Sequence, residues 1–292
     1  MRRLSNSQIF LIVCLCIGVA LFLIYQRNHQ QQGTKTESAK IVFPATRDEN
    51  MALGNPSKAN KSDINNLLIE RAQYTLSYNN SKGTANWVSW HLSNAWKGDA
   101  PRSENFFEDE NLPSACYKVT PKDYSKSGFD RGHLCPSDDR DGSVRDNEAT
   151  FLMDNIIPQA PKNNQEVWNE LESHARRLIK QGNELYIIAG CYGKGGENKY
   201  GNWKSTIAKG KVIVPSNVWK ILIVMPNGPN DAGRITEKTK VIAVDMPNTQ
   251  SAANYNWQYY KTSIDAIEAK TGYDFLSNLP VNVQAVIESK VE

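Results

Sequence analysis

The chain has 292 residues, of which 40% are hydrophobic and 22% charged, so it is long enough for a sizeable core and is not a disordered polypeptide. The formal net charge is +3, but residues 1–50 hold six Lys/Arg and three acids, and the remaining 28 basic and 28 acidic residues cancel. This balance excludes a strong overall positive field, so any attraction to nucleic acid must come from a local patch.

The chain opens with a predicted targeting segment, residues 1–25. Arg2 and Arg3 precede an uncharged apolar run of 17 residues, Ile9–Tyr25, at the lower end of the lengths that span a bilayer. No small-residue cleavage site follows, which favours a retained signal anchor over a cleaved signal peptide. The paired arginines favour an N-terminus in the cytoplasm. We therefore expect a membrane anchor with the catalytic domain outside the cytoplasm, or a secreted protein if the segment is cleaved.

Residues 26–60 are predicted to form a polar tether, because they are rich in Gln, Asn, Ser, Thr and Lys and poor in large apolar residues. Residues 61–292 have the pattern of one folded domain without an internal linker. This domain contains Cys116, Cys135 and Cys191. Since three is odd, at most one disulfide can form among them, and the sequence leaves the pairing open.

Segments rich in Ile, Val, Tyr and Trp predict strands at residues 87–92, 184–189, 211–214, 218–225 and 240–244. A helix is predicted from Asn163 or Asn164 to about Lys180, with Asn163 as N-cap, Glu166 completing a capping box and Gly182 following the end. A second helix is predicted from Thr262 or Ser263 to Gly272. Short connections between strands favour an α+β domain with a largely antiparallel central sheet flanked by helices.

The tetrapeptide Asp130-Arg131-Gly132-His133 carries groups suited to cutting a phosphodiester. Hydrolysis needs a base that takes a proton from water and positive charge that neutralises the phosphate. A histidine with a pKa near 6.5 can supply the base, and an arginine can hold two phosphate oxygens. We therefore interpret His133 as the candidate base, and His91 and His174 as structural or solvent-facing.

Two polar side chains of the first predicted helix complete the candidate site. The Asn164 carboxamide oxygen is a hard neutral ligand suited to Mg²⁺, and the alternative is that this residue caps the helix. Glu172 follows about 12 Å along the axis and ~80° round from Asn164, where it can orient a metal-bound water. Its alternative is a surface pair with Arg176. The acidic segment 137–141 is most simply a solvated loop.

These motifs, with the segment Asn155–Gln159 between them, resemble the DNA/RNA non-specific endonucleases, a ββα-metal family that includes mitochondrial endonuclease G. The resemblance runs more weakly from about Asn86 to Pro280. It implies a ββα-metal fold and 5′-phosphate products. It also implies that His133 is the general base and that Asn164 is the single protein ligand of Mg²⁺, with Mn²⁺ as a substitute.

The same resemblance implies roles for the remaining candidates. Glu172 would orient a metal-bound water, and Arg102 resembles a phosphate-contacting arginine. Arg131 and Asn155 would either support the groups that contact the substrate or lie on the phosphate side. The expected function is Mg²⁺-dependent, sequence-non-specific cleavage of DNA and RNA. The alternatives are a membrane-tethered phosphodiesterase acting on small or lipid-linked substrates, and an inactive nucleic-acid-binding homologue.

Overall fold

The computed structural model describes residues 5–30 and 43–292, and the chain forms two compact units, Met1–Val42 and Phe43–Glu292. The described part of the first unit is helix α1 (Asn6–Gln30). Within the described residues, no helix combines the length and the apolar character that crossing a membrane demands. This finding corrects the predicted membrane anchor and the location outside the cytoplasm that depended on it.

The second unit begins earlier in the chain than residue 61. Part of the predicted tether, residues 31–42, lies outside the described residues. Residues 43–60 belong to the folded unit, where Leu53 and Ala59 are buried in its core. Met51 and Ala52 are partly buried and pack against the same core, so this segment is part of the domain.

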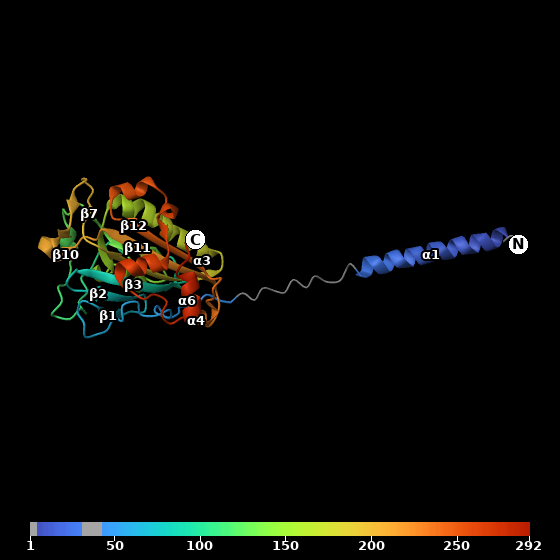
Figure 1. The fold of residues 1–292 in the computed structure, drawn as a ribbon, viewed down its shortest axis with the longest axis horizontal. Coiled ribbons are helices and arrows are strands. Elements are labelled where there is room, and N and C mark those ends of the chain that lie inside the picture. The colour runs from blue at the N-terminus through green and yellow to red at the C-terminus, as the bar shows by residue number, and fades with distance from the viewer. Residues whose placement is uncertain (1–4, 31–42) are drawn as a thin grey trace. The chain divides into compact units, whose positions relative to one another are not determined.

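A seven-stranded sheet occupies the centre of the folded unit, and its neighbouring strands are antiparallel throughout (Figure 1). The order across the sheet is β1-β2-β3-β6-β11-β12-β13. The strands are β1 (Leu67–Glu70), β2 (Thr75–Asn79), β3 (Thr84–Leu92), β6 (Asn183–Tyr192), β11 (Asn217–Pro226), β12 (Lys240–Pro247) and β13 (Lys261–Thr262). The α+β class and the antiparallel sheet predicted from the sequence are confirmed.

Side chains alternate between the two faces of the sheet along each strand, and both faces are covered. One face packs against α3 (Asn169–Lys180) and includes Trp90 and Leu222. The other packs against α5 (Ile264–Thr271) and α6 (Val281–Ile287) and includes Trp219. The alternation places Lys220, the neighbour of Trp219, on the α3 face.

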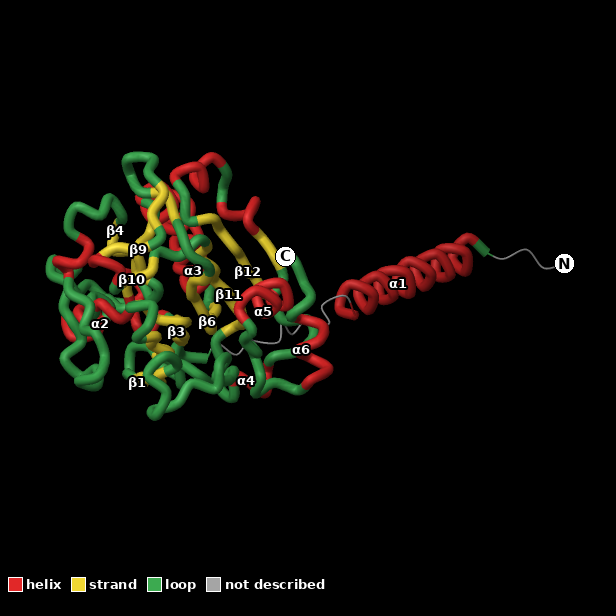
Figure 2. The backbone as a smooth tube through the Cα atoms, turned by 60° about the vertical axis from the view of Figure 1, so that its left-hand side comes forward, coloured by secondary structure: helices red, strands yellow, loops and turns green. Residues whose placement is uncertain are grey.

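Three short antiparallel strand pairs surround the main sheet, among loops that make up much of the surface (Figure 2). They are β4 (Asp130–His133) with β5 (Ile156–Gln159), β7 (Gly196–Glu197) with β8 (Trp203–Lys204), and β9 (Thr206–Ile207) with β10 (Val212–Ile213). The unit also contains α2 (Val144–Ala149), α4 (Asp231–Arg234), the π-helical segment Asn163–Trp168 and several short 3₁₀ helices. The three cysteines of the unit are buried and free.

Candidate active site

The β4–β5 pair places His133 at the end of a short ladder, opposite Ile156. The preceding residue must be glycine, because a Cβ atom at Gly132 would lie 2.0 Å from Gln159 Oε1. This close approach of the two strands holds the backbone of β4 against β5. His133 is thereby presented from a rigid element rather than from a mobile loop.

The His133 ring is 9% exposed, and its Nε2 atom has no hydrogen-bond partner among the described residues. It packs against the rings of Phe106 and Phe151, with centroids 5.4 and 4.8 Å away. Burial first, and then the charges of Arg102 and Arg131, lower the pKa of His133 to about 3. The imidazole is therefore neutral at pH 7, and its Nε2 atom is buried without a hydrogen-bond partner in the described part of the chain.

Asn155 holds the loop that follows His133. Its Oδ1 accepts a hydrogen bond from Cys135 N at 2.9 Å, and its Nδ2 donates to Cys135 O and Thr150 O, both at 2.8 Å. The side chain is fully buried. Every polar atom of the Asn155 carboxamide is thus used inside the protein, and the residue does not line the pocket that contains His133.

The helix that carries Asn164 begins at Pro161, a residue well suited to a first helical turn. Asn163 does not cap it, because its Oδ1 accepts from Gln159 Nε2 at 2.7 Å and its Nδ2 donates to Pro247 O at 2.8 Å. The predicted capping box is therefore wrong: the asparagine amide is used to join the helix to β5 and β12 instead.

Asn164 is oriented by Asp130. The Asn164 Nδ2 atom donates to Asp130 Oδ2 at 2.9 Å, and Gln165 Nε2 donates to the same oxygen at 2.8 Å. Because the amide nitrogen is committed to Asp130, the Asn164 oxygen is the atom that faces away from β4 and is available to a cation. A carboxamide oxygen held in this way fits a hard divalent metal ion.

A π-helical segment, Asn163–Trp168, changes the position of Glu172 relative to Asn164. In a regular α-helix the two residues would be ~80° apart around the axis. A π turn, with its i→i+5 hydrogen bonds, holds more residues per turn than the 3.6 of an α-helix, so each step through it rotates by less than 100° and the offset becomes smaller. The irregular turn therefore brings Asn164 and Glu172 onto one face of the helix.

Glu172 is paired with Lys220 rather than with Arg176. The Lys220 ammonium, almost fully buried on β11, donates to Glu172 Oε1 at 3.0 Å and lies 4.2 Å from the Trp168 ring centroid. Burial raises the pKa of Glu172, and the charge of Lys220 counteracts this. Arg176 instead contacts Asp139 and Asp138, at 3.3 and 3.6 Å.

Two arginines complete the site. Arg131 is exposed and lies over the Phe106 ring, 4.4 Å from its centroid. Arg102 hydrogen-bonds Ser137 Oγ and lies 5.1 Å from the Phe151 ring centroid. Both guanidinium groups stand beside His133, as their effect on its pKa shows. They supply the positive charge that a phosphate group needs.

All the sequence-predicted site residues except Asn155 line one pocket of about 310 Å³. Its lining is Arg102, Arg131, His133, Pro136, Ser137, Asp138, Asn164, Gln165, Asn169 and Glu172. The pocket thus combines an imidazole, a fixed carboxamide, two guanidinium groups and a carboxylate paired with a lysine. The groups that the sequence analysis expected to act as base, cation ligand and phosphate contacts are together in one small space.

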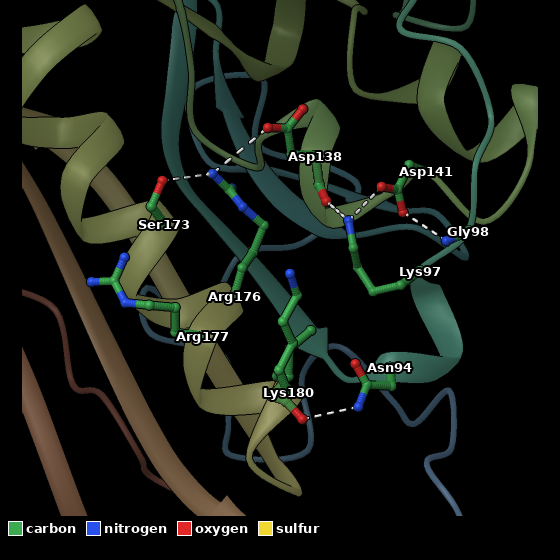
Figure 3. Close-up of a pocket in the computed structure, with 10 residues that line it drawn as sticks. Asn94, Lys97, Gly98, Asp138, Asp141, Ser173, Arg176, Arg177 and Lys180 are labelled. Carbon is green, nitrogen blue, oxygen red and sulfur yellow. Dashed lines mark hydrogen bonds and ion pairs between the residues drawn. The ribbon is translucent and has the colours of Figure 1, made fainter.

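A larger basic pocket of about 670 Å³ adjoins this one, and Asp138 lines both (Figure 3). Within it, Lys97 is paired with Asp141 at 2.5 Å, and Arg176 reaches Asp138. Figure 3 shows Lys180 extending its ammonium into the pocket from the end of α3. Lys180 and Arg177 are exposed and take part in none of the ion pairs recorded within residues 43–292.

A second group of potential metal ligands, Asp48, His91, Glu184 and Asp231, lies outside this pocket. Arg234 bonds both Glu184 and Asp231, and Tyr186 donates to Asp231 Oδ2 at 2.6 Å. The Nδ1 atom of His91 accepts from Asp48 N at 3.3 Å, so the proton of a neutral His91 ring resides on Nε2. This group has the contacts of a buried ion-pair network, in agreement with a structural His91.

Residues 53–282 match the profile of the DNA/RNA non-specific endonucleases. The chain belongs to this family.

Curated relatives of this family member are nucleases. A protein named Nuclease from Nostoc sp. is 48% identical over 244 residues, covering 83% of this chain and 85% of the relative. The mitochondrial endonuclease G of Bos taurus is 30% identical over 217 residues, covering 73% and 70% of the two chains. This chain is therefore a hydrolase, an endonuclease that acts on nucleic acids, and its family is metal-dependent.

A solved structure shares the fold of this nuclease. The crystal structure of a complex of EndoG with EndoGI, described as a mechanism of EndoG inhibition, aligns with a TM-score of 0.67. The match covers 83% of this chain and 96% of that chain at 23% identity. The likeness confirms the α+β architecture built on a large antiparallel sheet.

Sequence reasoning missed two features of the nuclease site. One is Lys220, whose only signal is a lysine in the middle of the apolar strand sequence Val218–Met225. The other is the aromatic wall formed by Phe106 and Phe151 around His133, which comes from loops without a recognisable motif. Both depend on segments that are distant in sequence and meet only in the folded domain.

Proposed function

We propose that this nuclease hydrolyses DNA and RNA phosphodiesters without strong sequence preference, with His133 as general base and Asn164 as the single protein ligand of Mg²⁺. The observation that carries the proposal is the shared pocket, in which the His133 imidazole and the oriented amide of Asn164 stand beside two arginines. The β4–β5 pair followed by this helix is the arrangement that the term ββα-metal describes.

Each group has a defined task in this proposal. The neutral His133 ring accepts the proton of the attacking water, since burial keeps its nitrogen unprotonated at neutral pH. Arg102 and Arg131 bind phosphate oxygens and offset the charge that develops on them. Glu172, whose Oε1 accepts a hydrogen bond from Lys220, orients a water of the metal's coordination shell. When bound, Mg²⁺ or Mn²⁺ supplies positive charge next to the phosphate and leaving oxygen.

Phosphate contacts alone account for indifference to sequence, because the backbone carries no base information. We infer that the nucleic acid backbone continues from the catalytic pocket into the adjoining basic pocket. The support is the shared wall at Asp138 and the exposed cations Arg177 and Lys180 beyond it. These local charges offer the attraction that the neutral domain lacks as a whole.

The direct test compares the wild-type protein with His133→Ala on supercoiled plasmid and on RNA, each with Mg²⁺ and with EDTA. We expect the alanine variant to lose about 10²- to 10⁴-fold in rate, as is usual when a general base is removed. EDTA should abolish wild-type cutting. His174→Ala, a histidine outside the pocket, is the matched control and should cut normally.

Two results would overturn the assignment. Cutting by His133→Ala at the wild-type rate would remove His133 as the base. Cutting that persists in EDTA would remove Asn164 as a metal ligand, while leaving open the nuclease activity itself.

A further inference from the structure

Three carboxylate side chains converge near the C-terminal end of the folded unit, on the sheet face opposite to α3. Asp265 and Glu268 project from one side of α5, since they are three residues apart, and Glu288 directly follows α6. One oxygen from each lies within 4.8 Å of the others. Asp265 N also donates to Glu288 O at 3.1 Å, so the two helices are already joined at this point.

Glu288 is the buried member of this carboxylate trio. The residue is 7% exposed, and its Oε1 atom has no hydrogen-bond partner. Glu268 is fixed by a bond from Phe275 N to its Oε1 at 2.7 Å, and Asp265 is exposed. The trio therefore has a rigid interior and one side open to solvent. A buried, unpartnered carboxylate oxygen that faces two further carboxylates lacks the positive partner that such groups normally have.

The nearby lysines are committed elsewhere. Lys270 Nζ contacts Asp245 Oδ2 at 2.6 Å, and Lys290 Nζ donates to Glu237 O at 2.7 Å. None of the ion pairs recorded within residues 43–292 involves Asp265, Glu268 or Glu288. Like charges held this close repel each other, so the arrangement is favourable only with a cation or a proton between them.

We propose that Asp265, Glu268 and Glu288 bind a divalent cation, with Ca²⁺ preferred. The ligands are all carboxylate oxygens, which suit a hard ion, and the trio contains no histidine or cysteine that would favour zinc. Calcium binds oxygens at about 2.3–2.6 Å, so ligands on opposite sides of one ion lie up to roughly 5 Å apart. The observed separations within 4.8 Å fit a single ion.

This cation would join α5 to the end of α6 and fasten the C-terminal segment to the sheet. It is independent of the proposed catalytic metal, because none of its ligands lines the catalytic pocket. Its effect is on the stability of the fold and is measured without any nucleic acid substrate. Failure of this proposal would therefore leave the nuclease assignment untouched.

The test uses the full chain, stripped with EDTA and then titrated with CaCl₂, followed by thermal unfolding and by calorimetry. With calcium well above its dissociation constant, we expect Tm to rise by about 5 °C or more, because the ion binds only the folded state. Asp265→Asn and Glu288→Gln should each lose most of this rise and of the binding heat. Asn164→Ala is the control and should keep both.

Several outcomes decide against the cation. No change in Tm and no binding heat in the wild type would mean that the trio is held by a shared proton. A calcium effect retained in Asp265→Asn and Glu288→Gln, or lost in Asn164→Ala, would place the ion elsewhere. If Glu288→Gln does not fold, the exposed Asp265→Asn substitution decides alone.

Discussion

Burial of His133 widens the pH range over which its imidazole is neutral. A histidine in water has a pKa near 6.5, but the Phe106 and Phe151 rings exclude water, and Arg102 and Arg131 repel a further positive charge. The ring then stays neutral far below pH 6.5. A lower pKa also makes His133 a weaker base. A larger fraction of the imidazole is unprotonated at neutral pH, but it binds a proton less tightly.

We expect kcat/KM for a short nucleic acid substrate to stay level as the pH falls through 6.5. The lowered pKa of about 3 keeps His133 unprotonated there, and the acidic limb should appear only near that value or where the fold is lost. Arg131→Ala removes one repelling charge and should move the limb to higher pH, whereas Arg177→Ala should not. A wild-type limb centred at pH 6.5 would show that His133 is solvated in the working enzyme.

At the scale of single elements, β11 contributes to the site through one side chain. Lys220 lies on the same face of β11 as Leu222 and Val224, among the buried residues that pack against α3. Its ammonium is compensated by Glu172 and contacts the Trp168 and Trp90 rings. A buried charge of this kind is stable only with its partner.

Lys220→Met should therefore destabilise the protein by about 3–5 kcal/mol, because it leaves Glu172 buried and unpaired. It should also lower the cleavage rate, since an uncompensated Glu172 takes up a proton. The double substitution Lys220→Met/Glu172→Gln should recover stability in urea unfolding but not plasmid cleavage. Equal activity of the single variant and the wild type would show that Glu172 has no part in orienting water.

The elements differ in how far the sequence predicts them. Strands such as β6 and β11 were predictable, because a buried strand is a continuous run of Ile, Val and aromatic residues. The start of the helix before Asn164 was not, because Asn163 has a strong capping side chain that tertiary contacts with Gln159 and Pro247 redirect. Local preference favoured a cap, and hydrogen bonds to the preceding strand β5 and to the distant strand β12 overrode it.

The residues in and around the site likewise differ in how far the sequence predicts them. The motif at residues 130–133 and Asn164 could be predicted as neighbours from a resemblance to a family. Asp139 and Arg140, in the acidic segment expected to be a solvated loop, are instead buried. Arg140 donates to Gln73 O at 2.7 Å and to His91 O at 2.9 Å, and the Trp90 indole donates to Asp139 Oδ2. A charged residue is predicted to be exposed when the partners that compensate its burial are distant in the sequence.

For the whole molecule, the balanced charge of the domain makes local patches decisive. Beyond residue 50 the basic and acidic residues cancel, so long-range attraction to a polyanion is weak. The exposed Arg177 and Lys180 at the end of α3 are the cations of the adjoining pocket that lack an ion-pair partner within the described domain. Binding of a long substrate should depend on them more than hydrolysis of a small one does.

Arg177→Glu/Lys180→Glu should raise KM for plasmid. It should also reduce the slope of log KM against log salt concentration by about 2, since each neutralised phosphate contributes ~0.9 to that slope. Hydrolysis of a small phosphodiester should be unchanged, because the catalytic pocket is intact. Lys238→Glu/Lys240→Glu reverses two exposed lysines elsewhere and so matches the change in net charge. Parallel salt slopes for the two variants and the wild type would contradict a nucleic acid path through this pocket.

The π turn at Asn163–Trp168 makes this helix less stable than a regular one, but it places Asn164 and Glu172 on one face. Removing one residue would allow uniform helical hydrogen bonding there, and a more robust but inert polypeptide would result, because the amide and the carboxylate would diverge around the axis. In the proposed mechanism, this short stretch therefore holds a less favourable helical conformation that positions two catalytic groups together.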